Sequence, residues 1–232
     1  MVPGCALNDG QGFGREAIVE IDWFGHACFR LRGREGTVIT DPYAKEIGLN
    51  FPRPRGDIVT ISHLHPGHGF AQGVKGDPKI ISGPGEYEIK NIFITGVSTA
   101  HDKKGGKDRG KNTVYVFDLD GLTICHLGDL GHVPTQPQRE AFGNVNILLI
   151  PVGGVTTIGG GEAAEIVSML EPQIVIPMHF AHTDLGFKLD TSAKFFKEMG
   201  IKAPALVSSL KMTKDSLPKE TQVVLLEAKQ KE

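Results

Sequence analysis

The chain has 232 residues and a formal net charge of −2, and hydrophobic residues make up 40% of it. That length and apolar content predict a single domain over residues 17–232, preceded by a flexible N-terminal extension at residues 1–16. The nearly balanced charge argues against a general affinity for nucleic acid or for anionic membranes.

The three cysteines form no CxxC pair and are odd in number. Cys28 and Cys125 lie in apolar runs, so we expect buried, reduced side chains rather than a disulfide framework. No segment is typical of a signal peptide, and no apolar run is long enough to cross a bilayer. These features predict a cytoplasmic protein.

The first half of the chain predicts strands joined by tight turns. Apolar runs bounded by Gly, Pro, Asn or Asp predict strands at residues 17–23, 28–32, 37–40, 57–62, 79–82, 86–89, 92–99, 113–119 and 122–126. Lys90-Asn91 and Asp120-Gly121 are hairpin turn signals. A short helix is expected at residues 68–74, and the basic stretch 102–111 predicts a loop.

The second half alternates strands with helices. It predicts helices at residues 137–142, 162–170 and 191–199, and strands at residues 146–151, 174–177 and 222–226. Two strand-rich halves with a few helices are expected to pack as two sheets with the helices outside.

One β-branched strand, residues 58–62, ends in His63, His65 and His68. The Pro-Gly pair between the last two histidines ends the strand and turns the chain. Imidazole nitrogens that converge on one point form a metal site, and bond lengths of about 2.0–2.1 Å suit zinc. The alternative is three loop histidines, or a chance cluster beside an anion-binding or nucleic-acid-binding surface. Three histidines in so short a segment favour the metal site.

Three further apolar strands end near a side chain that can bind metal: His101, Asp129 and His179. Taken singly, such a residue is commonly a cap or a solvated turn. Taken together, they would meet where sheets of α/β proteins hold their sites. A carboxylate that joins histidines can bridge two cations and leave a position for water, which is the arrangement of a hydrolytic metal centre. His126 lies within its strand, so we expect it to be packed.

These segments resemble the metallo-β-lactamase superfamily, and within it the branch of zinc-dependent hydrolases that includes ascorbate-6-phosphate lactonase. The resemblance covers residues 18–228 and implies a four-layer αββα sandwich, an α/β fold of the α+β type, with metals at one edge between the sheets. The motifs that carry it are Trp23-Phe-Gly-His-Ala-Cys28, Thr40-Asp-Pro42, Ser62-His-Leu-His-Pro-Gly-His68, His101-Asp102, His126-Leu-Gly-Asp-Leu-Gly-His132, Pro151-Val-Gly-Gly154 and Ile176-Pro-Met-His179.

The resemblance also implies a ligand set. The residues that match the first-metal ligands are His63, His65 and His101. Those that match the second-metal ligands are His68 and His179, and Asp129 matches the carboxylate shared by both metals. We expect Zn²⁺ as one or two ions, while Mn²⁺ or Fe would also suit mixed His and Asp ligands.

One position departs from the family pattern. An acid usually stands immediately before the third histidine of the motif, and here that residue is Gly67. We therefore hypothesise that one metal binds firmly and a second weakly, or that Asp41 or Asp102 moves in as a substitute. The missing carboxylate also leaves the centre more positive, which favours an anionic substrate.

The ligands predict a mechanism in which metal-bound water loses a proton near neutral pH and attacks a carbonyl or phosphoryl centre. Asp129 would orient this nucleophile as a catalytic residue. His132, and also His26, could donate a proton or contact the substrate, or could be structural hydrogen-bonding residues. Asp41 and Asp102 are candidates to accept the second N–H of a ligand imidazole.

We therefore predict a metal-dependent hydrolase of a small-molecule substrate: an anionic ester, lactone or phosphodiester. One alternative is a nuclease of the same superfamily, which the net charge disfavours. Another is a non-catalytic or degenerate metal-binding protein, which Gly67 favours. We expect no membrane partner, and a homo-oligomer is compatible with the sequence. Loop 102–111 could act as a lid, and the Gly-rich stretch 151–161 is either a turn-rich connection or a substrate loop.

Overall fold

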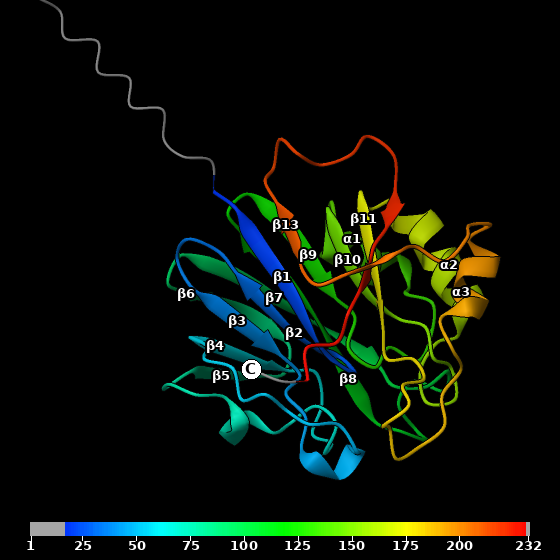
Figure 1. The fold of residues 1–232 in the computed structure, drawn as a ribbon, viewed down its shortest axis with the longest axis horizontal. Helices are drawn as coiled ribbons and strands as arrows, with labels where there is room; N and C mark the ends of the chain where they lie inside the picture. The colour runs from blue at the N-terminus through cyan, green and yellow to red at the C-terminus, as the bar shows by residue number, and fades with distance from the viewer. Residues whose placement is uncertain (1–16, 231–232) are drawn as a thin grey trace, which may run out of the picture.

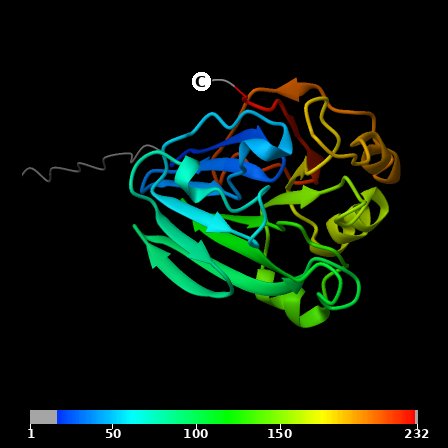
Figure 2. The same cartoon turned by 90° about the horizontal axis from the view of Figure 1, so that it is seen from below.

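The structure, a computed structural model, describes residues 17–230. The extension predicted at residues 1–16 therefore lies outside the described residues. Two mixed β-sheets stack face to face, and helices cover the outer face of one of them (Figures 1 and 2). This arrangement is the predicted αββα sandwich with few helices, in which the layer over the first sheet is reduced to connecting segments with two short 3₁₀ turns.

The first sheet has six strands, and it carries the histidine-rich segment at the end of one of its central strands. Strands β1 to β3 are antiparallel, whereas β3, β4 and β5 run parallel. Every residue of β4 is buried, as its continuous β-branched run predicts. In sheet order the strands are β13 (Leu210–Met212), β1 (Val19–Gly25), β2 (Cys28–Arg32), β3 (Thr37–Thr40), β4 (Ile58–Ile61) and β5 (Lys79–Ser82).

The second sheet has seven strands, antiparallel from β6 to β9 and parallel from β9 to β14. Both predicted hairpin turns are confirmed: Lys90 and Asn91 join β6 to β7, and Asp120 and Gly121 join β8 to β9, all with positive φ. In sheet order the strands are β14 (Gln222–Val223), β11 (Ile174–Met178), β10 (Ile147–Pro151), β9 (Leu122–His126), β8 (Lys111–Leu119), β7 (Ile92–Ala100) and β6 (Gly85–Ile89).

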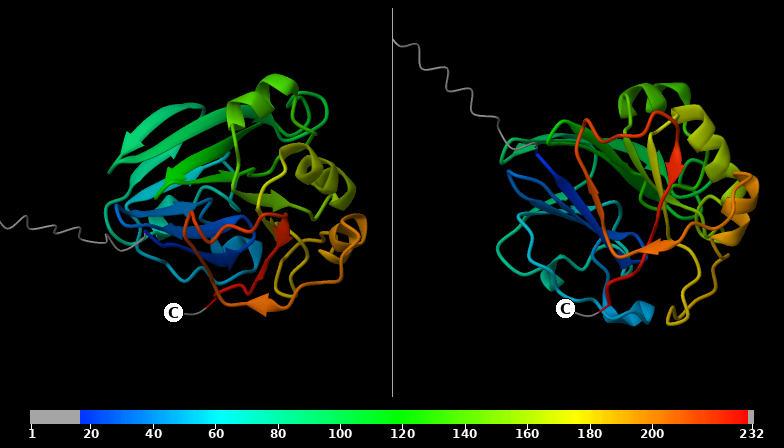
Figure 3. Two further views of the ribbon diagram at one scale, coloured as in Figure 1. Left: turned by 90° about the horizontal axis from the view of Figure 1, so that it is seen from above. Right: turned by 45° about the horizontal axis from the view of Figure 1, so that its top comes forward.

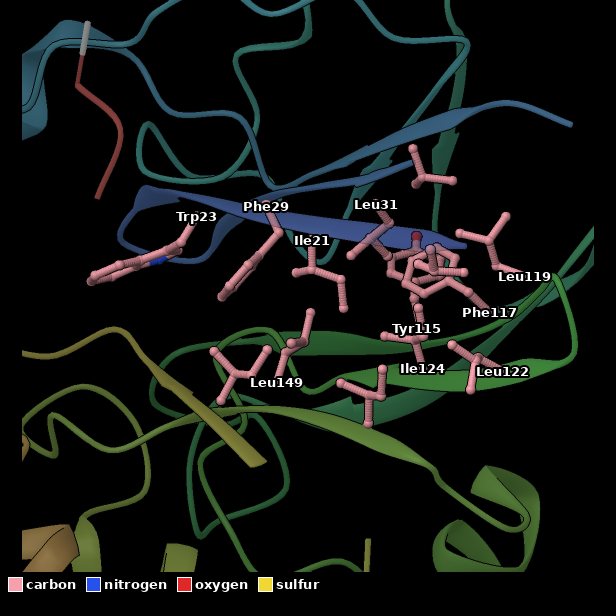
Figure 4. Close-up of a cluster of buried hydrophobic side chains, with 14 of the residues drawn as sticks. Ile21, Trp23, Phe29, Leu31, Tyr115, Phe117, Leu119, Leu122, Ile124 and Leu149 are labelled. Carbon is pink, nitrogen blue, oxygen red and sulfur yellow. The ribbon is translucent and has the colours of Figure 1, made fainter. Parts of the chain in front are cut away.

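The main core fills the space between the two sheets (Figure 4). Ile21, Phe29 and Leu31 of the first sheet point toward Phe117 and Ile124 of the second, and all five side chains are fully buried. Burial of one such side chain contributes about 1.5–3 kcal/mol. This interface fixes the two sheets relative to each other, and so it also fixes the side chains that each sheet supplies to their common edge.

The outer faces of the two sheets are covered differently (Figure 3). Helices α1 (Gln136–Phe142), α2 (Gly160–Leu170) and α3 (Ala193–Glu198) lie over the second sheet, and their buried apolar residues form one cluster with residues of β8 to β11. The first sheet is covered by connecting segments that contain two short 3₁₀ turns, η1 (Lys45–Ile47) and η2 (Ala71–Gly73).

Two predicted elements are wrong. The helix expected at residues 68–74 is reduced to the single turn η2, because the chain curls tightly at Gly69, whose N–H bonds to His65 O at 2.9 Å. The strand expected at residues 222–226 is divided between two sheets. Its first part is β14, and its second part, β15 (Leu225–Leu226), pairs with β12 (Leu206–Val207), a strand that the sequence analysis did not predict.

Two other sequence predictions can be compared with the structure. Cys28 and Cys125 are buried and free, as expected. Over residues 17–230, no helix has the length and apolar character needed to cross a membrane.

Candidate metal centre

Side chains from both sheets meet around the carboxylate of Asp129, which follows β9. Its Oδ2 lies 3.2 Å from Nε2 of His68, 3.2 Å from Nε2 of His101 and 3.9 Å from Nε2 of His63. Its Oδ1 lies 3.2 Å from Nε2 of His179. The structure therefore brings together five of the six predicted ligands at one point.

The turn after β4 explains how two residues of the histidine motif reach the same point. The N–H of His68 bonds to His65 O at 2.9 Å, so the backbone curls back immediately after the strand. This curl brings the rings of His63 and His68 to a centroid separation of 4.4 Å. Their convergence depends on the Pro-Gly pair, which ends the extended conformation.

Asp41, which follows β3, holds His68 in a defined orientation. Its Oδ2 lies 2.8 Å from Nδ1 of His68, and its two oxygens also accept bonds from Ser62 N at 2.7 Å and Ser62 Oγ at 2.6 Å. Because Nδ1–H donates to Asp41, Nε2 of His68 is directed at Asp129. Asp41 thus accepts the Nδ1–H of His68, one of the predicted imidazole ligands, which is the role expected for it. Its engagement contradicts the hypothesis that it moves in as a substitute ligand.

The centre combines two ionised carboxylates with one imidazole, that of His68, which is readily protonated, and another, that of His63, which resists protonation. Burial opposes a charge on His68, but Asp129 and Asp41 outweigh that effect and raise its pKa to about 10. Burial likewise opposes the charge on Asp129, yet His179 and His68 hold its pKa well below its usual value. Burial, assisted by His68, lowers the pKa of His63 to about 3. A bound cation can therefore replace the proton of His68 as the compensating charge.

Several polar atoms at the centre have no hydrogen-bond partner among the described residues. They include Nε2 of His63 and Oδ1 of Asp129, which face the middle of the cluster, and Nδ1 of His26, His101 and His179. A buried polar atom without a partner is costly, and a metal ion would remove that cost for the inward-facing pair. The donors are imidazole nitrogen and carboxylate oxygen, which suit zinc, so the residues fit a metal centre.

His65 is the predicted ligand that lies outside the cluster. Its side chain is exposed, and its ring stacks on His63 at a centroid distance of 5.8 Å. It is one wall of a cavity of about 420 Å³ whose other walls are mainly apolar. The residues that line this cavity are Ala44, Glu46, Leu64, His65, Pro66, Gly69 and Phe70. His65 therefore separates the cluster from the adjoining apolar cavity.

His26 joins the cluster, although the sequence analysis did not assign it as a ligand. It lies in the turn between β1 and β2, is 4% exposed, and places Nε2 3.1 Å from Nε2 of His68. The described residues contain two sets whose donor atoms lie within 4.8 Å of one another: His26, His68 and His179, and His63, His68 and Asp129. The only local signal was a histidine in a tight turn, and this signal does not distinguish a ligand from a structural residue.

Three residues at the centre have a left-handed backbone although none is glycine. The φ angles are 52° at His26, 39° at Asp41 and 51° at His179. Such conformations cost about 1–3 kcal/mol each and are concentrated at functional sites. Each of these residues directly follows a strand or occupies the turn between two strands, so the conformation directs its side chain into the cluster.

His132 and Asp102 have other roles in the structure. Nε2 of His132 accepts the N–H of Ala100 at 3.2 Å, and Nδ1 donates to Val133 O at 2.9 Å. With both nitrogens bonded to backbone, the geometry favours the structural interpretation of His132, and its catalytic role stays a prediction. Asp102 accepts N–H groups of its own loop at 2.7–3.0 Å. It neither supplies the missing ligand nor contacts an imidazole of the cluster.

His126 is buried and its Nε2 lies 2.8 Å from Ala27 O, which confirms that it is packed rather than ligated. Asn112 is a positioning residue that the sequence analysis missed. Its Oδ1 accepts the N–H of Asp129 at 2.9 Å, and its Nδ2 donates to Leu127 O at 2.9 Å and to Thr99 Oγ1 at 2.8 Å. An asparagine within a strand gives no sequence signal of this role.

Known proteins with similar sequences and structures are consistent with this geometry. A family model described as the β-lactamase superfamily domain matches residues 20–179. Two archaeal proteins named UPF0173 metal-dependent hydrolases are similar to the chain. One, from Pyrococcus abyssi, is 27% identical over 192 residues (70% of this chain, 85% of the relative), and one from Pyrococcus horikoshii is 28% identical over 195 residues with the same coverage.

A solved structure from Thermotoga maritima, described as a candidate zinc-dependent hydrolase of the metallo-β-lactamase superfamily, is 38% identical to the chain. The match covers 90% of this chain and 98% of that one, with a TM-score of 0.74. A candidate metal-dependent hydrolase from Parabacteroides distasonis shares the fold at 20% identity and a TM-score of 0.60, over 80% of this chain and 91% of that one.

Proposed function

We propose that this chain, which belongs to the metallo-β-lactamase superfamily and is a metal-dependent hydrolase, cleaves a small anionic ester, lactone or phosphodiester. The observation that carries the proposal is the carboxylate of Asp129 within 3.2–3.9 Å of four imidazole nitrogens. Few other functions would require so many imidazole donors around one buried acid.

Each residue of the centre would have its own role in such a reaction. Metal ions held there would supply a Lewis acid and an activated water. Oδ2 of Asp129 lies within 3.9 Å of Nε2 of His63, His68 and His101, and Oδ1 lies 3.2 Å from Nε2 of His179, so this carboxylate would be the shared ligand. Asp41 keeps His68 in the tautomer that points Nε2 at the centre. Burial of the cluster excludes bulk water from all but its outer edge.

Two features support the substrate class. Gly67 removes one negative charge from the usual ligand set, which favours an anionic group at the metals. The mainly apolar cavity next to His65 could hold an apolar part of the same molecule. Phosphorylated lactones, the substrate class of the ascorbate-6-phosphate lactonase branch, combine a hydrolysable ring with an anionic group and form the first class to assay.

A non-catalytic metal-binding protein is the second candidate, and Gly67 is the observation that favours it. A nuclease is a weaker alternative because the formal net charge is −2 and offers no overall attraction to a polyanion. The hydrolase and the binding protein differ in a simple respect: a binding protein would take up metal without turning over any hydrolysable substrate.

The test is a hydrolysis screen of lactones, thioesters and phosphodiesters with Zn²⁺ or Mn²⁺, in the wild-type protein and in Asp129→Asn. We expect turnover of at least one anionic substrate and its loss in Asp129→Asn, since the amide cannot act as an anionic shared ligand. His182→Ala is the matched control, because His182 contacts Asp184 of its own loop at 3.7 Å. Turnover of neutral substrates alone would refute the substrate class. Metal uptake without any turnover would favour the binding protein.

A further inference from the structure

Position 67 and the ring of His26 compete for the same space. An ideal Cβ placed at Gly67 would lie 2.8 Å from Nε2 of His26 and 3.2 Å from its Cδ2. Real Cβ atoms essentially never approach another heavy atom within 3.0 Å. The imidazole therefore stands where the side chain of the usual acid would enter the centre. The missing acid has left room that another donor occupies.

The position of His26 is held by the backbone as well as by packing. Its carbonyl oxygen accepts the N–H of His179 at 3.0 Å and Nε1–H of Trp23 at 3.1 Å. Its ring lies 4.7 Å from the ring of His68 and 4.2 Å from that of His179, measured between centroids. This turn fixes the ring between the two histidines expected to hold the second metal.

The distances suit a shared cation. Two nitrogens bound to zinc at 2.0–2.1 Å with a tetrahedral angle lie ~3.3 Å apart. The Nε2 atoms of His26 and His68 lie 3.1 Å apart, and Oδ1 of Asp129 lies 3.2 Å from Nε2 of His179. The alternative is a plain hydrogen bond between the two imidazoles.

We propose that His26 replaces the missing acid as a ligand of the second metal, alongside His68, His179 and the shared Asp129. The inference rests on the metal-dependent function proposed above. It restores a four-donor site with three imidazoles and one carboxylate, which is the number that zinc requires. Imidazole donors suit zinc, so we expect this site to bind zinc.

The test measures zinc content after dialysis in the wild-type protein, His26→Ala, His26→Ala/Gly67→Asp and the control His182→Ala. We expect two equivalents in the wild-type protein and the control, and one equivalent in His26→Ala. We expect two again in the double variant, because removal of the ring frees the space for the introduced aspartate to serve as the ligand. Cobalt(II) substitution gives a second readout, since loss of one site reduces the visible absorption of the bound ions.

Each other outcome has a defined meaning. Two firmly held equivalents in folded His26→Ala would overturn the inference, as would a wild-type protein that holds one equivalent while remaining active. A wild-type protein that binds no zinc or cobalt would overturn both the inference and the proposed function. If circular dichroism shows that His26→Ala does not fold, the zinc content of His26→Ala/Gly67→Asp tests the inference instead. Two equivalents in the folded double variant would support the exchange of ligands, and one would refute it.

Discussion

Two groups of histidines around Asp129 differ in how firmly they are held. We refer to His26, His68 and His179 as the inner group, and to His63, His65 and His101 as the outer group. The inner residues are 4%, 0% and 1% exposed. In the outer group His101 is also buried and His63 is half-buried, whereas His65 is open to solvent beside the apolar cavity. The inner group is positioned before any ligand arrives, and the outer group reaches, at His65, the space from which a substrate would enter.

The difference arises from the partners of each group. Asp41 fixes His68 through a 2.8 Å contact, and the backbone of His26 is bonded to that of His179 at 3.0 Å. His65 is held mainly through the turn that contains it. Preorganised ligands bind a metal at lower entropic cost, so we expect the inner group to govern metal affinity and the outer group to govern substrate recognition.

The largest expected effect is the loss of one inner histidine. His68→Ala would leave the buried carboxylate of Asp41 without its imidazole partner, and breaking such a buried pair costs about 3–5 kcal/mol. His65→Ala removes an exposed ring and should change the free energy of unfolding by less than about 0.5 kcal/mol. Urea unfolding of the two metal-free variants measures both values. Equal destabilisation would remove the distinction between the groups.

The next effect concerns the support of the inner group. Asp41→Asn keeps the shape of the side chain but removes the charge that orients His68, so we expect metal affinity to fall about 10–100-fold. Asp102→Asn is the matched control, because Asp102 bonds to its own loop and should leave the affinity unchanged. Competition with a chromophoric chelator gives the two dissociation constants. An unchanged affinity in Asp41→Asn would show that Asp41 serves folding alone.

The pH dependence of the metal-free protein provides a third comparison. The pKa of His68 is raised from 6.5 to about 10, so the stability that its proton provides is complete below pH 6.5 and is lost as the pH rises to about 10. The pKa of His63 is lowered to about 3, so His63 makes stability rise between pH 3 and 6.5 and contributes no slope above that. Between pH 6.5 and 10, His68→Gln should therefore flatten the decline in Tm, whereas His63→Gln should not. The same slope in both variants would contradict this assignment.

The smallest expected effect lies at the cavity. Leu64 is 84% exposed and lines its wall, so Leu64→Ala should raise KM about three- to tenfold for substrates with an apolar group and leave kcat and Tm unchanged. Ile80 on β5 is also exposed, at 59%, but does not line the cavity, so Ile80→Ala should change neither KM nor kcat. Steady-state kinetics on the substrate found in the screen measures this difference. An unchanged KM in Leu64→Ala would place the substrate elsewhere.

Much of the fold could be predicted from the sequence because the strands that end at the centre are apolar and bounded by strong turn residues. Strand β4 and the two hairpins are examples, since each carries a local pattern that needs no tertiary information. Strand β12 has only two residues, so no local pattern reveals it, and the sequence does not show that β15 leaves the second sheet to pair with it. The helix predicted at residues 68–74 failed because burial of His68 and the curl at Gly69 overrode local propensity.

The predicted ligands of the centre are those that follow strands. The role of His26 was not predicted, because it depends on two residues that are distant in the sequence and close in space. His101 and His179 each directly follow a strand, and His63 begins the turn after β4, and the sequence shows this directly. His26 lies in a turn much earlier in the chain than Gly67. The spacing of the residues therefore gives no sign that a side chain at position 67 and the ring of His26 would occupy the same space. Asn112 was missed for the same reason, because its bonds join segments that meet only in the folded chain.

The left-handed conformations of His26, Asp41 and His179 have a consequence for evolution and for engineering. Glycine would relax each of these positions and would, by backbone energetics alone, make the protein more stable. It would also delete an imidazole or a carboxylate from the centre. The left-handed backbone therefore costs about 1–3 kcal/mol at each of these positions. At Asp41 the buried pair with His68 outweighs that cost, since breaking such a pair costs about 3–5 kcal/mol, so a selection for thermostability alone would be expected to keep Asp41.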